Sequence, residues 1–304
     1  MLQRIAPAAF VCIWATGFIG ARLGLPYSEP GTFLAIRFGV AFVLLTLIAM
    51  ALKAKWPGWK MALHSIAIGS LLHGFYLGGV FWSIEHGMPA GVSAVIVGLQ
   101  PLLTAVLAGW LLNEVITKQH WGGVILGIIG VVLVLAPKID IADSGINGAT
   151  IMASVFGMIA VTLGTIYQKQ AGSSIDLKSG TTLQYLGGFL PVAALSFFME
   201  TQEIEWSFEM IFAMIWAIFV LSIFAIFILM WLIRQGSVAK LSTLFFLVPG
   251  VTAIIAYFLF GEVLIPIQLF GMLLCAAAVA LASRSNIHSK DKTSPLAQAL
   301  DGSK

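Results

Sequence analysis

The hydrophobic positions of this chain form long continuous stretches separated by short polar breaks. Dividing the sequence at charge clusters and at Gly/Pro turns leaves ten stretches of about 20 residues, the length of a helix that crosses a bilayer. They cover residues 4–24, 31–52, 62–84, 88–112, 118–137, 148–168, 179–199, 208–233, 238–260 and 264–284. Because hydrophobic and polar residues do not alternate along them, these stretches predict helices and not the strands of a membrane barrel.

The composition points to the bilayer as the solvent. Of the 304 residues, 60% are hydrophobic and 10% are charged, and the mean hydropathy is +1.00, whereas soluble domains carry about 25% charged residues. The first stretch, which follows Arg4, could pass for a signal peptide. However, no small-residue cleavage site leads into a soluble domain, and further spans follow at once. We therefore expect an all-α membrane protein that retains its first helix.

The positive charges gather on one side of the predicted spans. With a cytoplasmic N-terminus, the inner side holds thirteen of the sixteen Lys and Arg residues, and only Arg22, Arg37 and Lys138 fall outside. The positive-inside rule then predicts a multi-pass protein of the inner membrane with both termini in the cytoplasm. Residues 285–304 are polar and lack an apolar period, so we expect a disordered cytoplasmic tail there.

A spaced Pro-Glu pair occurs twice in the chain. Pro101 and Glu114 lie thirteen positions apart, as do Pro249 and Glu262, and the second pair follows the first after 148 residues. Flanking landmarks repeat as well: Gly123 matches Gly271 at 148, Gly87 and Ala90 match Gly236 and Ala239 at 149, and Arg22 matches Lys169 at 147. The sequence therefore predicts two related halves, residues 4–137 and 148–284.

Each predicted half contains five spans. Because five is odd, the second half enters the membrane from the opposite side, and the two repeats are inverted. Folds of this kind place a substrate site between the halves near the middle of the membrane, and rocking about that site gives alternating access. A small-molecule substrate and the lipid bilayer are therefore the expected partners. No feature indicates nucleic acid, and a homo-oligomer stays open.

Several of these motifs resemble a known family. They are Trp14-Ala-Thr-Gly-Phe-Ile-Gly-Ala-Arg22, Arg37, the run Ala90-Gly-Val-Ser-Ala-Val-Ile-Val-Gly-Leu-Gln-Pro101, and the closing segments Asn113-Glu114 through Gly122-Gly123 and Gly261-Glu262 through Gly271. Together they look like the ten-helix, EamA-type members of the drug/metabolite transporter superfamily, over about residues 5–284. The resemblance implies a basket of ten helices around a central cavity, which exports small metabolites or amino acids.

Arg37 is the sharpest candidate for a binding residue, because it lies seven residues into the second span. A charge at the centre of the bilayer costs about 2.5–3.5 kcal/mol on insertion scales, so an intramembrane Arg is a functional hypothesis. Arg37 could bind a substrate carboxylate or face the outer vestibule. Equally, it could extend outward to the interface or pair with Glu29.

His73 and Tyr76 lie near the middle of the third span, one turn apart on a similar face. Together they could form hydrogen bonds with a polar substrate and stack against an aromatic one. The alternative is a neutral histidine in the helix core, bonded to a backbone carbonyl.

Ser93 and Gln100 share one face of the fourth span, and Pro101 follows directly. Proline lacks an N–H and its ring disturbs the helix, which frees the carbonyl of Val97. Such a kink fits beside a cavity. Pro249 repeats the predicted kink, but Val248 stands where Gln100 would be, so we expect an asymmetric cavity lining.

The remaining candidates for contact with the substrate are weaker. Trp14 and Phe18 share a face of the first span, Thr165 lies on the sixth, and Phe245 approaches Pro249 on the ninth. An aromatic stripe at helical spacing is more often packing than binding, so both interpretations stay open.

The two repeated glutamates, Glu114 and Glu262, favour a structural role. Each ends a helix near the start of the next one, where a carboxylate can accept hydrogen bonds from free N–H groups. The two cysteines, Cys12 and Cys275, form no metal-binding pattern, and we expect both to be small buried residues.

The sequence contains no obvious machinery for catalysis. Its five histidines include no HExxH pair, and neither a P-loop nor a GxSxG motif occurs, so we expect neither a catalytic residue, a cofactor nor a metal. No carboxylate falls in the middle of a span, which leaves His73, Glu85 and His86 as candidates for proton coupling. The prediction is an exporter of amino acids or related compounds, proton-coupled or facilitated. A membrane-embedded enzyme and a proton-coupled drug or cation carrier are the alternatives.

Overall fold

The computed structural model describes residues 2–111, 118–135, 145–171, 175–228, 248–262 and 265–283. Within these ranges helices are joined by loops, and the only strand-type pairing is an isolated β-bridge between Ser28 and Ile204. The first half contains α1 (Leu2–Gly24), η1 (Leu25–Tyr27), α2 (Pro30–Ala51), α3 (Trp59–Gly69), η2 (Ser70–Phe75), α4 (Tyr76–Glu85), α5 (Ala90–Gly98), α6 (Gln100–Leu111) and α7 (Lys118–Leu135). The second contains α8 (Gly148–Ala171), α9 (Leu177–Met199), α10 (Phe208–Ile215), η4 (Trp216–Phe224), α13 (Val248–Phe260) and α14 (Pro266–Ser283).

The described helices follow the apolar stretches closely. Six helical segments are long and apolar enough to cross a bilayer: 9–27, 30–51, 59–85, 148–168, 177–199 and 208–228. Four shorter apolar helices, at 90–104, 121–134, 248–260 and 266–278, lie within the other predicted stretches. The protein is therefore a helical membrane protein. The predicted tail, residues 285–304, lies outside the described residues.

The fourth predicted span, residues 88–112, was expected to be one helix kinked at Pro101, but the structure divides it into α5 and α6. The helix stops at Leu99, whose N–H bonds to Ile96 O at 3.2 Å in a tighter turn, and α6 begins at Gln100. Pro101 is the second residue of α6, where its missing N–H costs least. The proline thus starts a new helix and does not bend an existing one.

Two other spans contain π-helical turns. The helix from Trp59 to Glu85 passes through η2, and the one that begins with α10 passes through η4. A π-helical turn widens the helix and is found frequently at functional sites. Each π-helical turn therefore marks a stretch where the backbone departs from α-helical hydrogen bonding.

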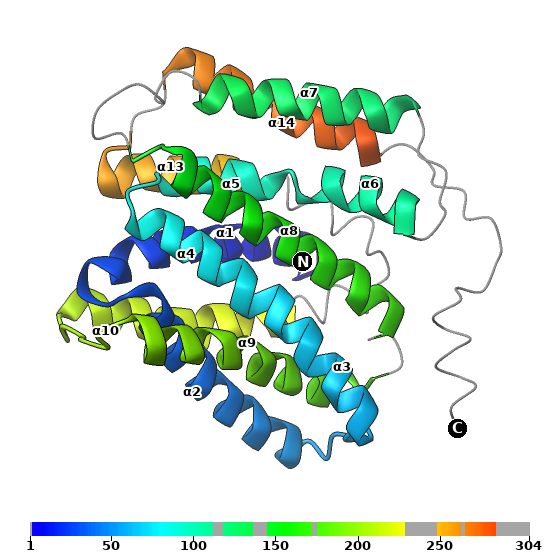
Figure 1. The fold of residues 1–304 in the computed structure, drawn as a ribbon, viewed down its shortest axis with the longest axis vertical. Coiled ribbons are helices and arrows are strands. Elements are labelled where there is room, and N and C mark those ends of the chain that lie inside the picture. Colours follow the sequence, from blue (N-terminus) through cyan, green and yellow to red (C-terminus); the bar gives the residue numbers. More distant parts are fainter. Residues whose placement is uncertain are drawn as a thin grey trace.

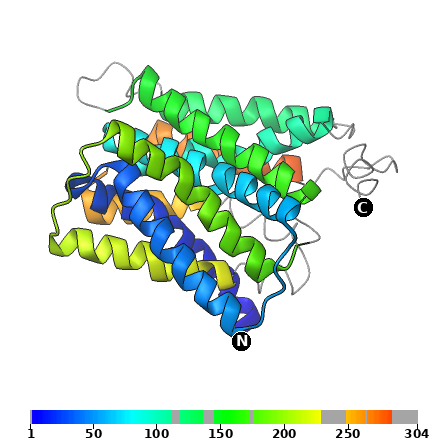
Figure 2. The same cartoon turned by 60° about the horizontal axis from the view of Figure 1, so that its bottom comes forward.

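The helices are arranged with α7 and α14 along one edge and α2 at the opposite one (Figure 1, Figure 2). The helices α5, α6 and α13 lie beside the α7–α14 pair, and α4 and α8 cross between them and α9 (Figure 1). Large apolar side chains cover the outside, including Phe208 at 80% and Phe258 at 77% exposure. Such surfaces are rare on soluble monomers and fit contact with lipid.

A pair of carboxylates fastens the start of α2 to the end of α9. Glu200 accepts hydrogen bonds from the backbone N–H groups of Gly31 and Thr32, both at 2.7 Å. In the other direction, Glu29 accepts from the N–H groups of Thr201 at 2.8 Å and Gln202 at 3.1 Å. The bonds to Glu200 satisfy free N–H groups at the first turn of α2, and those to Glu29 satisfy N–H groups just after α9. We call this arrangement the Glu29–Glu200 clasp.

Candidate functional site

Arg37 is buried inside the helix bundle. Its side chain is only 6% exposed, and its Nε donates a hydrogen bond of 3.0 Å to Oγ of Ser222 in η4. Ser222 in turn donates to the carbonyl of Ala217 at 2.9 Å. The suggested pairing with Glu29 is not found among the described residues, because that carboxylate belongs to the Glu29–Glu200 clasp. Burial also means that Arg37 does not extend outward to the interface.

Aromatic rings surround this arginine. The rings of His73 and Tyr185 are stacked, with centroids 4.8 Å apart and planes 27° apart. Phe38 lies edge-on to Tyr185 at 5.9 Å and tilted to His73 at 6.0 Å. Cζ of Arg37 lies 5.4 Å from the centre of the Phe38 ring, within the range of a cation–π contact. Side chains from α2, η2 and α9 therefore converge at one place.

Tyr76 adds a second phenol from α4. It is buried, and both Tyr76 and Tyr185 are close enough to Arg37 to interact electrostatically with the guanidinium. We name the set the Arg37 cluster. Its members are Arg37, Phe38, His73, Tyr76, Tyr185 and Ser222.

The chemistry of the Arg37 cluster suits an anion beside an apolar ring. An arginine keeps its charge and offers five N–H donors in a fork that matches a carboxylate. Among the described residues, no carboxylate forms an ion pair with Arg37. A buried charge without a paired counter-charge is costly, so a ligand that supplied a negative group here would be stabilised.

Sequence reasoning found Arg37, His73 and Tyr76 but missed Phe38, Tyr185 and Ser222. Phe38 and Tyr185 look like ordinary span residues, and Ser222 is one small hydroxyl in a very apolar stretch. The signal that could have found two of them is the repeat, because Tyr185 follows Arg37 by 148 residues and Ser222 follows His73 by 149.

The structure joins two other predicted residues, Gln100 and Thr165. Nε2 of Gln100 donates to Oγ1 of Thr165 at 3.0 Å, and Thr165 donates to the carbonyl of Val161 at 2.7 Å. The first bond connects the start of α6 to α8. Both side chains are half-buried, so this pair is a second polar position within the bundle.

Ser93 lies in a buried chain of hydroxyl groups. It is 3.2 Å from Oγ of Ser154, which donates to Oγ of Ser83 at 2.9 Å. Ser83 then donates to the carbonyl of Thr150 at 2.8 Å. Small polar residues of this kind connect packed helices in membranes, and here they link α4, α5 and α8.

On α1, Phe18 belongs to the main hydrophobic cluster, and Trp14 is half-buried with its ring 5.2 Å from that of Phe10. Cys12 is exposed, which corrects the expectation that it is buried, whereas Cys275 is buried. Cys12 faces outward from α1, where lipid accommodates a small apolar thiol. Phe245 and Glu114 lie outside the described residues.

The repeated proline and glutamate of the second half lie against α5. Pro249 is the second residue of α13, and a Cβ added to Gly98 would be 2.9 Å from its ring. Glu262 Oε1 is 3.4 Å from the backbone N–H of Ala90 and accepts its hydrogen bond. The carboxylate therefore sits at the start of a helix from the first half, and not at the start of α14 as the sequence suggested.

A further set of polar contacts joins α3, α8 and α9. Nδ1 of His64 and the hydroxyl of Tyr167 are 2.5 Å apart. Nε2 of Gln184 donates to Oε1 of Gln168, also at 2.5 Å. Because Tyr167 and Gln168 are neighbours near the end of α8, we call the two bonds the Tyr167–Gln168 latch.

Comparison with known proteins agrees with this architecture. The EamA-like transporter family model matches residues 5–136 and 148–284. The uncharacterized transporter YvbV of Bacillus subtilis (strain 168) is 26% identical over 285 residues, covering 91% of this chain and 90% of that protein. The uncharacterized inner membrane transporter YedA of Escherichia coli (strain K12) is 27% identical over 297 residues, covering 90% and 88%.

Two further similarities extend over nearly the whole chain. Protein PecM of Dickeya dadantii (strain 3937) is 24% identical over 293 residues, covering 95% of both chains. A crystal structure shares the fold with a TM-score of 0.64 at 15% sequence identity, covering 91% of this chain and 96% of that one. With the family model matched across both halves, the chain belongs to the EamA-like transporter family.

Proposed function

We propose that this protein is an inner-membrane exporter of small amphipathic metabolites, with amino acids and related carboxylates first among them. Ten spans form two inverted five-helix repeats, and the substrate binds at the Arg37 cluster between them. The observation that carries this proposal is the symmetry of the cluster. It contains two central contacts, Arg37 with Ser222 and Tyr185 with His73, and the repeat relates the residues of one contact to those of the other.

The repeat relates Arg37 to Tyr185 at an offset of 148 and His73 to Ser222 at an offset of 149. Arg37 bonds to Ser222 at 3.0 Å, and Tyr185 stacks on His73 at 4.8 Å. Exchanging the two halves converts one contact into the other. The cluster thus lies where a twofold axis between the repeats would pass, which is the place for a substrate site in inverted-repeat transporters.

The two π-helical turns obey the same relationship. Shifting η2, residues Ser70–Phe75, by 149 positions gives residues 219–224, which fall inside η4 at Trp216–Phe224. Equivalent helices of both halves therefore widen at equivalent positions along the chain. Their shared distortion supports a common origin and a common functional position.

The pair of α7 and α14 supports the inversion independently. Sγ of Cys275 donates to the carbonyl of Gly127 at 3.7 Å, and these residues are 148 positions apart. On either side, Gly130 faces Gly271 and Gly122 faces Leu281, so the helices are antiparallel. Two equivalent helices that run in opposite directions and cross at equivalent residues are what an inverted repeat requires.

Alternating access needs a barrier on each side of the site. The Glu29–Glu200 clasp closes the ends of α2 and α9 on the side assigned to the outside. The Tyr167–Gln168 latch joins α3, α8 and α9 toward the opposite end. Release of the latch would open the Arg37 cluster to the cytoplasm, and release of the clasp would open it outward.

The charge of the cluster favours one class of candidate substrates. Arg37 is a permanent cation, and no carboxylate pairs with it among the described residues. A cationic drug would be repelled here, whereas a carboxylate can take both arms of the guanidinium. An apolar group on the same molecule can lie against His73 or Phe38. We therefore favour an anionic or zwitterionic metabolite over a cation.

The test is counterflow in proteoliposomes with a panel of amino acids, nucleobases and cationic drugs at two pH gradients. We expect labelled carboxylates to accumulate inside the proteoliposomes without chemical change. Arg37→Ala and His73→Ala should lower this uptake without changing the amount of protein in the membrane. Normal transport by both variants would show that the site is wrong, and chemical conversion of the compound would indicate an enzyme.

Orientation needs its own experiment. In a Cys12→Ser, Cys275→Ser background, Gln202→Cys and Lys55→Cys place single thiols at exposed positions in opposite loops. An impermeant maleimide should label the Gln202→Cys protein on intact cells and the Lys55→Cys protein only after permeabilisation. The reverse pattern would overturn the cytoplasmic assignment of the termini.

A further inference from the structure

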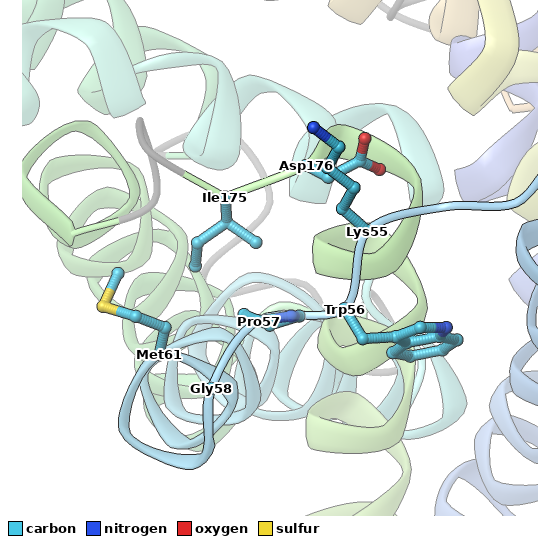
Figure 3. Close-up of a pocket in the computed structure, with 7 residues that line it drawn as sticks. All are labelled: Lys55, Trp56, Pro57, Gly58, Met61, Ile175 and Asp176. Carbon is cyan, nitrogen blue, oxygen red and sulfur yellow. The ribbon is translucent and has the colours of Figure 1, made fainter.

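A hollow of about 450 Å³ lies away from the Arg37 cluster, between the loop that joins α2 to α3 and the start of α9 (Figure 3). This volume is within the usual range for small-molecule sites, about 300–1,000 Å³. Its lining comes from both halves of the chain. The lining residues are Lys55, Trp56, Pro57, Gly58, Met61, Ile175 and Asp176.

Lys55 lines the hollow, and three more lysines lie within two residues of its lining in the chain. Lys53, Lys55 and Lys60 are exposed in the loop and first turn, and Lys178 follows from α9, where its Nζ donates to Leu52 O at 3.3 Å. Within the part of the chain that the structure describes, none of the four forms an ion pair. Their charge is therefore available to a ligand.

The one carboxylate in the lining is already engaged. Oδ1 of Asp176 accepts hydrogen bonds from the backbone N–H groups of Lys178 at 3.0 Å and Ser179 at 3.4 Å, so it caps α9. A carboxylate at a helix N-terminus is stabilised by the helix dipole. By contrast, the N-cap residue of α3 is Gly58, which offers no side-chain cap. The positive potential of the hollow is therefore only partly offset.

The lining of the hollow also includes apolar side chains. Met61 and Ile175 approach one another on one side, while Lys55 extends to the other (Figure 3). Beside them, Trp59 is 71% and Leu63 is 55% exposed. Trp at the end of a span marks the boundary between lipid and water. The exposed Trp59 beside the hollow therefore favours a position near the headgroup level of a membrane.

We propose that this hollow binds the headgroup of an anionic phospholipid from the cytoplasmic leaflet. Lys55 and the lysines near it in the chain contact the phosphate, and the acyl chains extend into the lipid beside α3. Lysine clusters immediately cytoplasmic of a span attract anionic lipids. The choice of leaflet rests on the orientation in the proposed function. The binding chemistry does not depend on it.

A lipid in this position would contact both halves of the transporter. Lys55 and Met61 belong to the first half and Ile175 to the second, and Oγ of Ser179 already donates to the carbonyl of Lys55 at 2.7 Å. An occupied hollow therefore stabilises the state in which these two loops are together. Anionic lipid becomes a regulator of the conformational equilibrium.

The test measures lipid retention on the purified full-length protein by native mass spectrometry. The probes are dioleoyl phosphatidylglycerol, dioleoyl phosphatidylcholine and soluble glycerol phosphate. We expect one phosphatidylglycerol per chain, with little phosphatidylcholine or glycerol phosphate bound. Lys55→Gln and Lys60→Gln should each weaken retention about fivefold, since one lysine near a lipid surface contributes about that factor. Lys55→Arg should restore it.

Two variants separate a built site from general surface charge. Lys118→Gln removes an exposed lysine at the start of α7 and should leave retention unchanged. Met61→Trp keeps every charge but fills the hollow, and it should abolish the preference for phosphatidylglycerol. The proposal is overturned if both lipids bind equally, if Lys118→Gln has the effect of Lys55→Gln, or if glycerol phosphate competes fully. If one of these outcomes is found while counterflow is normal, the lipid proposal fails but the proposed transport function stands.

Discussion

Arg37 and Ser222 are separated by 185 positions in the chain but are joined by a hydrogen bond of 3.0 Å from Nε to Oγ. Because the Ser222 hydroxyl donates its hydrogen bond to the carbonyl of Ala217, its oxygen is oriented to accept from the guanidinium. The bond thereby orients the arginine across the boundary between the two halves. Both members are buried, so its loss leaves polar groups away from water.

Ser222→Ala should destabilise the protein and weaken substrate binding. An unpaired buried donor costs about 1–3 kcal/mol, and Arg37 would also lose its orientation. The unfolding midpoint in detergent and the KM for counterflow report the two effects. Ser65→Ala is the control: Oγ of Ser65 is buried and has no hydrogen-bond partner among the described residues, so that change should be neutral or stabilising. Equal losses in both variants would contradict the assignment.

The shape of the Arg37 side chain matters as well as its charge. Arg37→Lys keeps a cation but loses the planar fork, so we expect the KM for a carboxylate substrate to rise about tenfold, the equivalent of about 1.4 kcal/mol for a bidentate contact. Arg37→Gln should raise it further. Arg22→Gln changes another arginine, which lies over the Phe260 ring at 5.8 Å, and should have little effect. Saturation curves in proteoliposomes check these expectations.

The fold followed from sequence wherever local pattern decided it. Apolar runs of span length predicted the helices to within a few residues, because lipid leaves a long apolar segment no alternative to a helix. The break at Leu99 was missed, since a proline in an apolar run is compatible with either a kink or a new helix. The π-helical turns η2 and η4 were missed too, because they change hydrogen bonding without changing hydrophobicity.

The candidate site was predictable only in part. Arg37 and His73 stood out because polar groups at membrane depth are expensive. Their partners Tyr185 and Ser222 come from spans more than 100 residues away, and which spans meet depends on tertiary packing. Ser93 lies on the predicted face but is bonded to Ser154, because a buried hydroxyl takes the nearest acceptor. The repeat was the missing guide. Tyr185 is the repeat equivalent of Arg37 and stacks on His73, and Ser222 is the repeat equivalent of His73 and bonds to Arg37.

The Glu29–Glu200 clasp should contribute measurably to stability. Glu200→Gln removes the charge that accepts from the first turn of α2, and loss of such a cap costs about 1 kcal/mol. We expect a lower unfolding midpoint. Because the clasp closes the outer side in the proposed mechanism, we also expect faster uptake from outside. Glu203→Gln is a matched control, since this exposed side chain caps no helix among the described residues. If Glu203→Gln lowers stability as much as Glu200→Gln does, the effect comes from the loss of a negative charge in general and not from the hydrogen bonds of the clasp.

The contact of α7 with α14 depends on glycine at position 130. A Cβ there would lie 2.7 Å from the carbonyl oxygen of Gly271 and 2.9 Å from the backbone nitrogen of Cys275. Neither atom can rotate away, so Gly130→Ala must push the helices apart. Overpacking of this kind costs about 1–3 kcal/mol.

On the same helix, a Cβ at Gly122 would meet only the end of the Leu281 side chain, at 3.8 Å. Gly122→Ala should therefore leave the unfolding midpoint nearly unchanged, and it serves as the control for Gly130→Ala in the same detergent. Gly271→Ala, whose Cβ would be 2.6 Å from the carbonyl oxygen of Gly130, should reproduce the loss. If Gly130→Ala and Gly122→Ala are equally stable, the two helices are not in close contact. The proposed crossing of equivalent residues in the two halves would then lose its support.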